Sequence, residues 1–128
     1  MTSTLANQVI QVNQYNLVQS REAYIAASQA LAQRTEEEGH SGVIAYKFFA
    51  DTNAETAGAV ITYVDAGAWL AHHEIAYQWE EMPQLQASVQ LQRLILFGPL
   101  NDRIKARLAE AELSYTHYDL PAGGFIRS

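Results

Sequence analysis

A strand runs into a helix within the segment Tyr63-Val64-Asp65-Ala66-Gly67-Ala68-Trp69-Leu70-Ala71-His72-His73, and this junction decides the fold. An apolar run over residues 57–64 ends at Asp65, a residue type that accepts hydrogen bonds from the free amides of a first helical turn. We therefore predict a strand that ends here and a helix that starts at about Ala66. This helix carries an aromatic residue and two histidines in its first turns, which favours a small pocket beside the sheet.

Composition and charge restrict the class of protein. The chain has 128 residues, of which 48% are hydrophobic, and this is enough for one domain with a buried core. We expect a single domain over residues 1–128, with its core at about 7–98 and a C-terminal extension at about 99–128. The net charge of −6 disfavours nucleic acid and anionic membrane surfaces as partners, because both attract basic proteins.

The same composition bears on where the protein works. Cysteine is absent, so the sequence allows neither disulfides nor thiol chemistry. The first 20 residues hold no Lys or Arg and no long apolar run, so we expect no signal peptide. No segment approaches the roughly 20 apolar residues that span a bilayer. We expect a soluble, cytoplasmic protein.

The order of the expected elements predicts the fold class. Strands are expected at residues 9–17, 42–50, 57–64 and 89–97, and long helices at 21–38 and 66–79. Ser20 is the expected N-cap of the first helix, and Gly39 is expected to end it in the left-handed conformation. This β-α-β-β-α-β order is ferredoxin-like, an α+β fold whose antiparallel sheet has its helices on one face.

Shorter elements complete the expected chain. A short helical piece is expected over residues 83–88, since Pro83 is compatible with a first helical turn. After the fourth strand, Asn101 is expected to cap an extra C-terminal helix that runs to about Ala111. Residues 113–118 form a last short strand in this scheme, and a loop and tail follow.

The strands are apolar on both faces, which bears on the partner of this chain. Apolar residues occupy both alternating sets of positions in the second and fourth strands, with Val43, Ala45 and Phe49 opposite Ile44, Tyr46 and Phe48, and Ile95 and Phe97 opposite Leu94 and Leu96. Helices cover only one face of such a sheet, and an uncovered apolar face would be a large exposed patch. We predict that the same face of a second copy covers it, giving a homodimer. The alternative is that the C-terminal tail folds back over the sheet.

Five short segments follow one another in a characteristic order, namely Glu38-Gly39, Tyr46-Lys47-Phe48, Asp51-Thr52-Asn53, Tyr63-Val64-Asp65 and Ala68-Trp69-Leu70-Ala71-His72. In this order they resemble the dimeric α+β barrel superfamily and, within it, the antibiotic biosynthesis monooxygenase (ABM)-like domains. The resemblance covers about residues 9–97, and residues 98–128 lie outside the family's usual pattern.

The resemblance implies a barrel of two facing sheets, with a pocket between each sheet and its helices. Many members of this superfamily are cofactor-free oxygenases that act on quinol or polyphenol substrates. Others bind haem, isomerise or decarboxylate small molecules, or have no known activity, so the fold does not settle the function.

The two adjacent histidines are the first candidates for chemistry. The family pattern points to His72, whereas helical periodicity places His73 on the sheet-facing stripe with Trp69 and Tyr77, which makes His73 the more buried. Either imidazole would move protons near neutral pH. The alternative is one core histidine bonded to the backbone and one exposed histidine. Neighbouring helical side chains diverge by about 100°, so we expect no shared metal, and we expect no cofactor.

Three further residues are candidates for shaping the pocket or for stabilising a developing charge. Trp69 is expected to stack on a flat ligand or to pack in the core. Arg93 interrupts an apolar strand, and a buried arginine needs an anion, either a substrate oxyanion or an intersubunit carboxylate. Asn13 is expected either to donate to a reacting oxygen or to lie on the surface of an edge strand.

The remaining candidates are aromatic. Tyr46 and Tyr63 lie on strands that line the pocket or the interface, where their hydroxyls would hold a phenol or satisfy the backbone. Trp79 would stack on a flat ligand or pack in the core.

Two functions remain open at this point. One is a cofactor-independent monooxygenase that acts on a compact aromatic or quinol-like molecule. The alternative is a non-catalytic small-molecule-binding or assembly domain on the same dimeric scaffold. An enclosed pocket of roughly 300 Å³ or more that receives a histidine favours chemistry. A sheet face packed solid by Phe48, Ile95 and the partner favours the scaffold.

Overall fold

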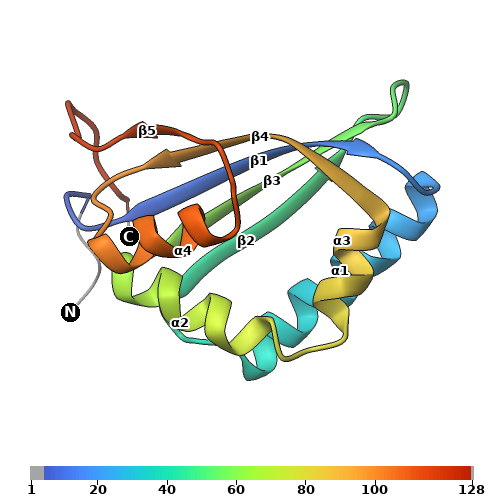
Figure 1. The fold of residues 1–128 in the computed structure, drawn as a ribbon, viewed down its shortest axis with the longest axis horizontal. Helices are drawn as coiled ribbons and strands as arrows, with labels where there is room; N and C mark the ends of the chain where they lie inside the picture. The colour runs from blue at the N-terminus through green and yellow to red at the C-terminus, as the bar shows by residue number, and fades with distance from the viewer. Residues whose placement is uncertain (1–4, 128) are drawn as a thin grey trace.

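Residues 5–127 are described by a computed structural model, in which a curved sheet has its helices on one side (Figure 1). The elements in chain order are β1 (Val9–Leu17), α1 (Arg21–Glu38), β2 (Val43–Ala50), β3 (Thr56–Tyr63), α2 (Ala66–Ala76), α3 (Glu81–Ser88), β4 (Val89–Phe97), α4 (Asp102–Glu110) and β5 (Thr116–Tyr118). The strand order in the sheet is β2-β3-β1-β4-β5. Strand β1 pairs antiparallel with both β3 and β4, and β2 pairs antiparallel with β3. The predicted ferredoxin-like α+β order is confirmed.

Side-chain caps start three of the helices. The Ser20 hydroxyl accepts from the Ala23 amide at 3.0 Å, and the Asp65 carboxylate accepts from the Ala68 amide at 2.9 Å. The side-chain oxygen of Asn101 accepts from the amide of the third residue after it at 2.9 Å. Each cap satisfies an amide that lacks an intrahelical partner, and all three were predicted.

Several predicted boundaries were wrong. The second helix ends at Ala76 rather than Trp79, and α3 starts at Glu81, ahead of Pro83. The last strand is limited to Thr116–Tyr118 and pairs parallel to β4, which makes the sheet mixed.

Gly39 ends α1 in an extended conformation, with φ −84° and ψ −176°, and not in the predicted left-handed one. Its amide donates to the Thr35 carbonyl at 3.0 Å and so closes the last turn of the helix. A Cβ at Gly39 would meet that same carbonyl oxygen at 2.4 Å. Close approach, and not handedness, therefore favours glycine here.

The inner face of the sheet, which meets the helices, is marked by alternation in β1. Val9, Gln11, Asn13, Tyr15 and Leu17 are all buried, whereas the residues between them are less so. One core cluster lies at the α2 and α4 end of this face and includes Leu96 and Ile104. A second cluster lies at the α1 and α3 end and includes Leu31 and Leu85.

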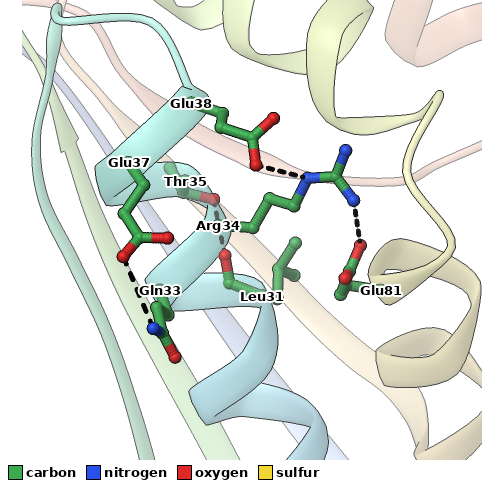
Figure 2. Close-up of polar contacts among 7 residues, drawn as sticks. All are labelled: Leu31, Gln33, Arg34, Thr35, Glu37, Glu38 and Glu81. Carbon is green, nitrogen blue, oxygen red and sulfur yellow. Dashed lines mark hydrogen bonds and ion pairs between the residues drawn. The ribbon is translucent and has the colours of Figure 1, made fainter.

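A charged contact ties α1 to α3 (Figure 2). The Arg34 guanidinium forms ion pairs with Glu38 at 3.3 Å and with Glu81 at 3.2 Å. Its central carbon also lies 5.1 Å from the ring centroid of Trp79, within cation–π range. Trp79, which precedes α3, is thereby held beside Arg34 of α1.

The outer face of the sheet, on the side opposite the helices, carries apolar residues. Val12 pairs with both Val60 and Ile95 at its centre, and Phe49 and Phe97 are 58% and 39% exposed toward its ends. None of the described helices covers this face (Figure 1). The tail after β5 lies near Ile10 and Phe97 at one end of the sheet and does not cross the face. Within residues 5–127, no helix has the length and apolar character needed to cross a membrane.

Candidate functional site

A cavity of about 330 Å³ lies between the inner face of the sheet and the helices. Its walls come from β1, β2, β3 and β4 on one side and from α2, α3 and α4 on the other. Six of the predicted site residues line it, namely Asn13, Tyr46, Tyr63, Trp69, His72 and His73. Its volume lies at the lower end of the range for small-molecule sites.

Two predicted site residues lie elsewhere. Arg93 was expected to be buried, but it is exposed, because Leu94 takes the inner position and alternation turns Arg93 outward. Trp79 is buried in the second core cluster beside Arg34, outside the lining of the cavity.

A chain of side-chain hydrogen bonds runs along β1 at the cavity wall. The Trp69 indole Nε1–H donates to Gln11 Oε1 at 2.7 Å, and Gln11 Nε2 donates to Asn13 Oδ1 at 3.0 Å. Asn13 Nδ2 then donates to the Tyr15 hydroxyl oxygen at 2.8 Å. We call these four residues the relay.

The relay has a fixed direction. An indole nitrogen only donates, so the Gln11 oxygen must face Trp69 and the Gln11 amide nitrogen must face Asn13. Because the Asn13 oxygen accepts from Gln11, the Asn13 amide nitrogen faces Tyr15 and donates to its hydroxyl oxygen. The proton of the Tyr15 hydroxyl therefore points elsewhere. Among residues 5–127, no hydrogen bond takes up that proton.

Burial keeps the relay neutral. Gln11, Asn13 and Tyr15 are 8–9% exposed, and desolvation raises the pKa of Tyr15 to about 12 although the bond from Asn13 lowers it. Tyr15 is therefore a protonated hydroxyl at neutral pH. It lines the cavity as a free hydrogen-bond donor.

His73 is held in one tautomer by the backbone. Its Nδ1 lies 2.7 Å from the Trp69 carbonyl oxygen, which only accepts, so Nδ1 carries the proton and Nε2 has the lone pair. The ring stacks on Trp69 with centroids 3.7 Å apart. Burial, reinforced by the charges of His72 and Arg107, lowers the pKa of His73 to about 3 although the Trp69 bond raises it.

His72 is the more buried of the two histidines, at 2% exposed, so the periodicity argument that favoured His73 was wrong. Its ring packs between those of Tyr46 and Tyr63, with centroid distances of 5.1 Å and 5.9 Å. The His72 Nδ1 and the Tyr63 hydroxyl are buried without a hydrogen-bond partner. Burial, with a smaller effect of His40, lowers the pKa of His72 to about 4.

The cavity therefore presents neutral imidazoles and hydroxyls among aromatic rings. The His72 and His73 rings lie at 82° to each other, 5.4 Å between centroids. In the described part of the chain, no three His, Cys, Asp or Glu side chains are grouped to hold a metal ion.

Among the cavity residues that sequence reasoning missed, three matter most for the site. Gln11 and Tyr15 flank Asn13 at a spacing of two, and this polar alternation within a strand was a usable signal. Arg107 belongs to α4, and its place on the cavity wall depends on how that helix docks.

Comparison with solved structures places the fold. MupZ from Pseudomonas fluorescens matches with a TM-score of 0.73 and 20% identity over 94% of this chain and 95% of MupZ. SnoaB, a cofactor-independent oxygenase from Streptomyces nogalater, matches with a TM-score of 0.59 and 13% identity over 75% of this chain and 96% of its own. A proposed antibiotic biosynthesis monooxygenase from Caulobacter crescentus matches with a TM-score of 0.58 and 12% identity over 73% and 88%.

The chain therefore shares its fold with SnoaB and with the Caulobacter protein. The resemblance predicted from the five sequence segments is thus confirmed for the fold. No protein-family model and no curated protein matches the sequence. The relay and the histidines lie between the sheet and the helices, where the resemblance placed a pocket.

Acid should destabilise this protein through His72. Because the pKa of His72 falls from 6.5 to about 4 on folding, the unfolded chain takes up a proton first as the pH drops below 6.5. Between pH 7 and 5 this linkage lowers the free energy of unfolding by about 2 kcal/mol. Urea unfolding at pH 7 and at pH 5 measures this loss. Between the two pH values, the free energy of unfolding of His72→Phe should fall by about 2 kcal/mol less than that of wild type. Equal losses in the two proteins would contradict the assigned burial.

Proposed function

We propose that this chain is a cofactor-independent oxygenase of a compact aromatic or quinol-like molecule bound in the cavity. One observation carries the proposal: the Tyr15 hydroxyl at the end of the relay has no protein acceptor for its proton, and His72, whose Nδ1 has no partner, lines the same cavity. A buried donor and a buried base that the protein leaves unused are open to a ligand. The shared fold with SnoaB, a cofactor-independent oxygenase, adds support.

The walls of the cavity suit a flat ligand. The cavity is lined by the rings of Trp69, Tyr46 and Phe48 and by the two histidines. Aromatic rings favour stacked or edge contacts with a conjugated molecule. Tyr15 would donate to a ring oxygen of that molecule and stabilise the negative charge that develops there.

For an anthrone, the proposed reaction converts the activated CH₂ across the ring from the carbonyl into a second carbonyl. His72 takes one proton, the resulting enolate gives an electron pair to O₂, and a carbon–oxygen bond forms as a peroxide anion. The imidazolium returns its proton to the peroxide. Loss of the second C–H proton then breaks the O–O bond and releases water, so that CH₂ plus O₂ gives C=O plus H₂O.

Burial gives His72 two properties in this sequence of steps. It keeps the imidazole neutral and able to accept a proton at neutral pH, and it destabilises the imidazolium, so the proton passes readily to the peroxide. A base of such low pKa is weak, so proton removal from carbon depends on stabilisation of the developing negative charge by Tyr15. Tyr15 keeps its proton throughout because its pKa is about 12. It therefore acts as a hydrogen-bond donor and not as an acid.

Oxygen uptake with a panel of quinols and anthrones tests the proposal. Wild type should consume O₂ with at least one of them, and His72→Phe, which keeps a ring without a nitrogen, should be slower by roughly 100-fold or more. Tyr15→Phe should lose roughly tenfold or more, because it removes the donor to the developing charge. His117→Gln is the matched control, because His117 bonds to the Gly98 carbonyl outside the cavity. Lack of uptake across the panel, or equal rates in all variants, would exclude the reaction.

We further propose that two copies associate through the outer face of the sheet. The support is the row of apolar residues centred on Val12, Val60 and Ile95, which no described helix covers.

Light scattering at micromolar concentration tests this association. Wild type should have twice the chain mass of 14.2 kDa, and Val12→Asp should shift it toward one chain mass by placing a charge in the interface. A mass of 14.2 kDa for wild type would contradict the proposal.

A further inference from the structure

We infer that Arg107 selects ligands that carry a carboxylate, so that the molecule bound in the cavity is a conjugated acid whose charged group lies against α4. This inference rests on the proposed function and names the chemical class of its ligand.

The position of Arg107 is set by the docking of α4. Ile104 and Leu108 of this helix are 0% and 3% exposed and belong to the core cluster at the inner face of the sheet. Arg107 lies between them in sequence and lines the cavity, together with Leu108 and Ala111. The helix thus brings a guanidinium to the cavity wall that faces the sheet.

A ring also holds the Arg107 side chain. Its central guanidinium carbon lies 5.6 Å from the ring centroid of Tyr77, which lines the same cavity. This cation–π contact uses one face of the planar group and leaves its edge N–H donors open. Those donors match the two oxygens of a carboxylate.

Arg107 differs from the paired arginines of this chain. Arg34 forms ion pairs with Glu38 and Glu81, and Arg103 forms one with Glu74. No acidic side chain of residues 5–127 lies within ion-pair distance of Arg107. The guanidinium at the cavity is therefore free to take an anion from outside the protein.

The cavity has no competing charge. Among the described lining residues, none is Asp or Glu, and burial keeps His72 and His73 neutral at neutral pH. The whole chain has a net charge of −6, so it has no general attraction for anions. A preference for carboxylates must then come from this one guanidinium.

Two matched pairs of probes test the inference by calorimetric titration of the full chain. The first pair is 2-naphthoate and 2-naphthalenemethanol, and the second is anthraquinone-2-carboxylate and 2-(hydroxymethyl)anthraquinone. Within at least one pair, wild type should bind the carboxylate roughly tenfold or more tightly than the alcohol. Arg107→Gln should remove this preference while leaving the affinity for the alcohol unchanged.

Two further variants separate charge from structure. Arg107→Lys keeps the charge but loses the two-pronged geometry, so it should retain part of the preference. Arg103→Gln is the matched control on the same helix, because Arg103 is exposed and paired with Glu74. It should behave as wild type does.

Three results would overturn the inference: equal binding of carboxylate and alcohol by wild type, an unchanged preference in Arg107→Gln, or no carboxylate binding up to about 1 mM. Because binding is measured without turnover, it is independent of the oxygenase assay. A carboxylate preference without oxygen uptake would uphold the role of Arg107 and reject the reaction. Oxygen uptake with neutral quinols, without a preference for carboxylates, would uphold the reaction and reject the role of Arg107.

Discussion

The buried hydrogen bond from the Trp69 indole to Gln11 Oε1 is the interaction on which the candidate site depends. It spans 58 residues of sequence at 2.7 Å and fixes α2 against β1. Because an indole nitrogen only donates, this bond also orients Gln11, then Asn13 and finally Tyr15. The backbone of the same Trp69 residue sets the tautomer of His73, and its ring stacks on that histidine. One side chain therefore determines the polar geometry on both walls of the cavity.

Burial sets the charge state of the groups that line this cavity at neutral pH. It removes the charge from both histidines and keeps Tyr15 protonated, so the reactive groups are neutral bases and a neutral donor. Arg107 then stands out as a single positive charge on the helical wall. In such a low-dielectric site, one unpaired guanidinium has a large effect on which ligand binds.

Local signals made much of the fold predictable from the sequence. Asp65, Ser20 and Asn101 cap helices through bonds that span only three residues, so the sequence alone locates those starts. The ferredoxin-like order followed from the sequence of apolar runs. Boundaries failed where tertiary contacts decide them, as at Trp79, which leaves α2 and packs against Arg34.

The site was predictable only in part, and the failures have physical causes. Asn13, Trp69 and His72 were named before the structure and do line the cavity. Arg93 was misplaced because a strand with apolar residues on both faces gives no alternation from which to read its direction. Helical periodicity alone misjudged the burial of His72 because its ring packs between two strand tyrosines that no helical wheel includes. Arg107 needed the docking of α4, which no local pattern encodes.

A crystal structure of the protein with anthraquinone-2-carboxylate would test most directly whether the relay ends in a donor reserved for a ligand. The relay, as described, predicts the ring system between the sheet and the helices, with a ligand oxygen at hydrogen-bond distance from the Tyr15 hydroxyl. It also predicts that the bond from Asn13 to Tyr15 is retained. A ligand bound outside the cavity, or a Tyr15 hydroxyl that donates to a protein acceptor instead, would contradict it.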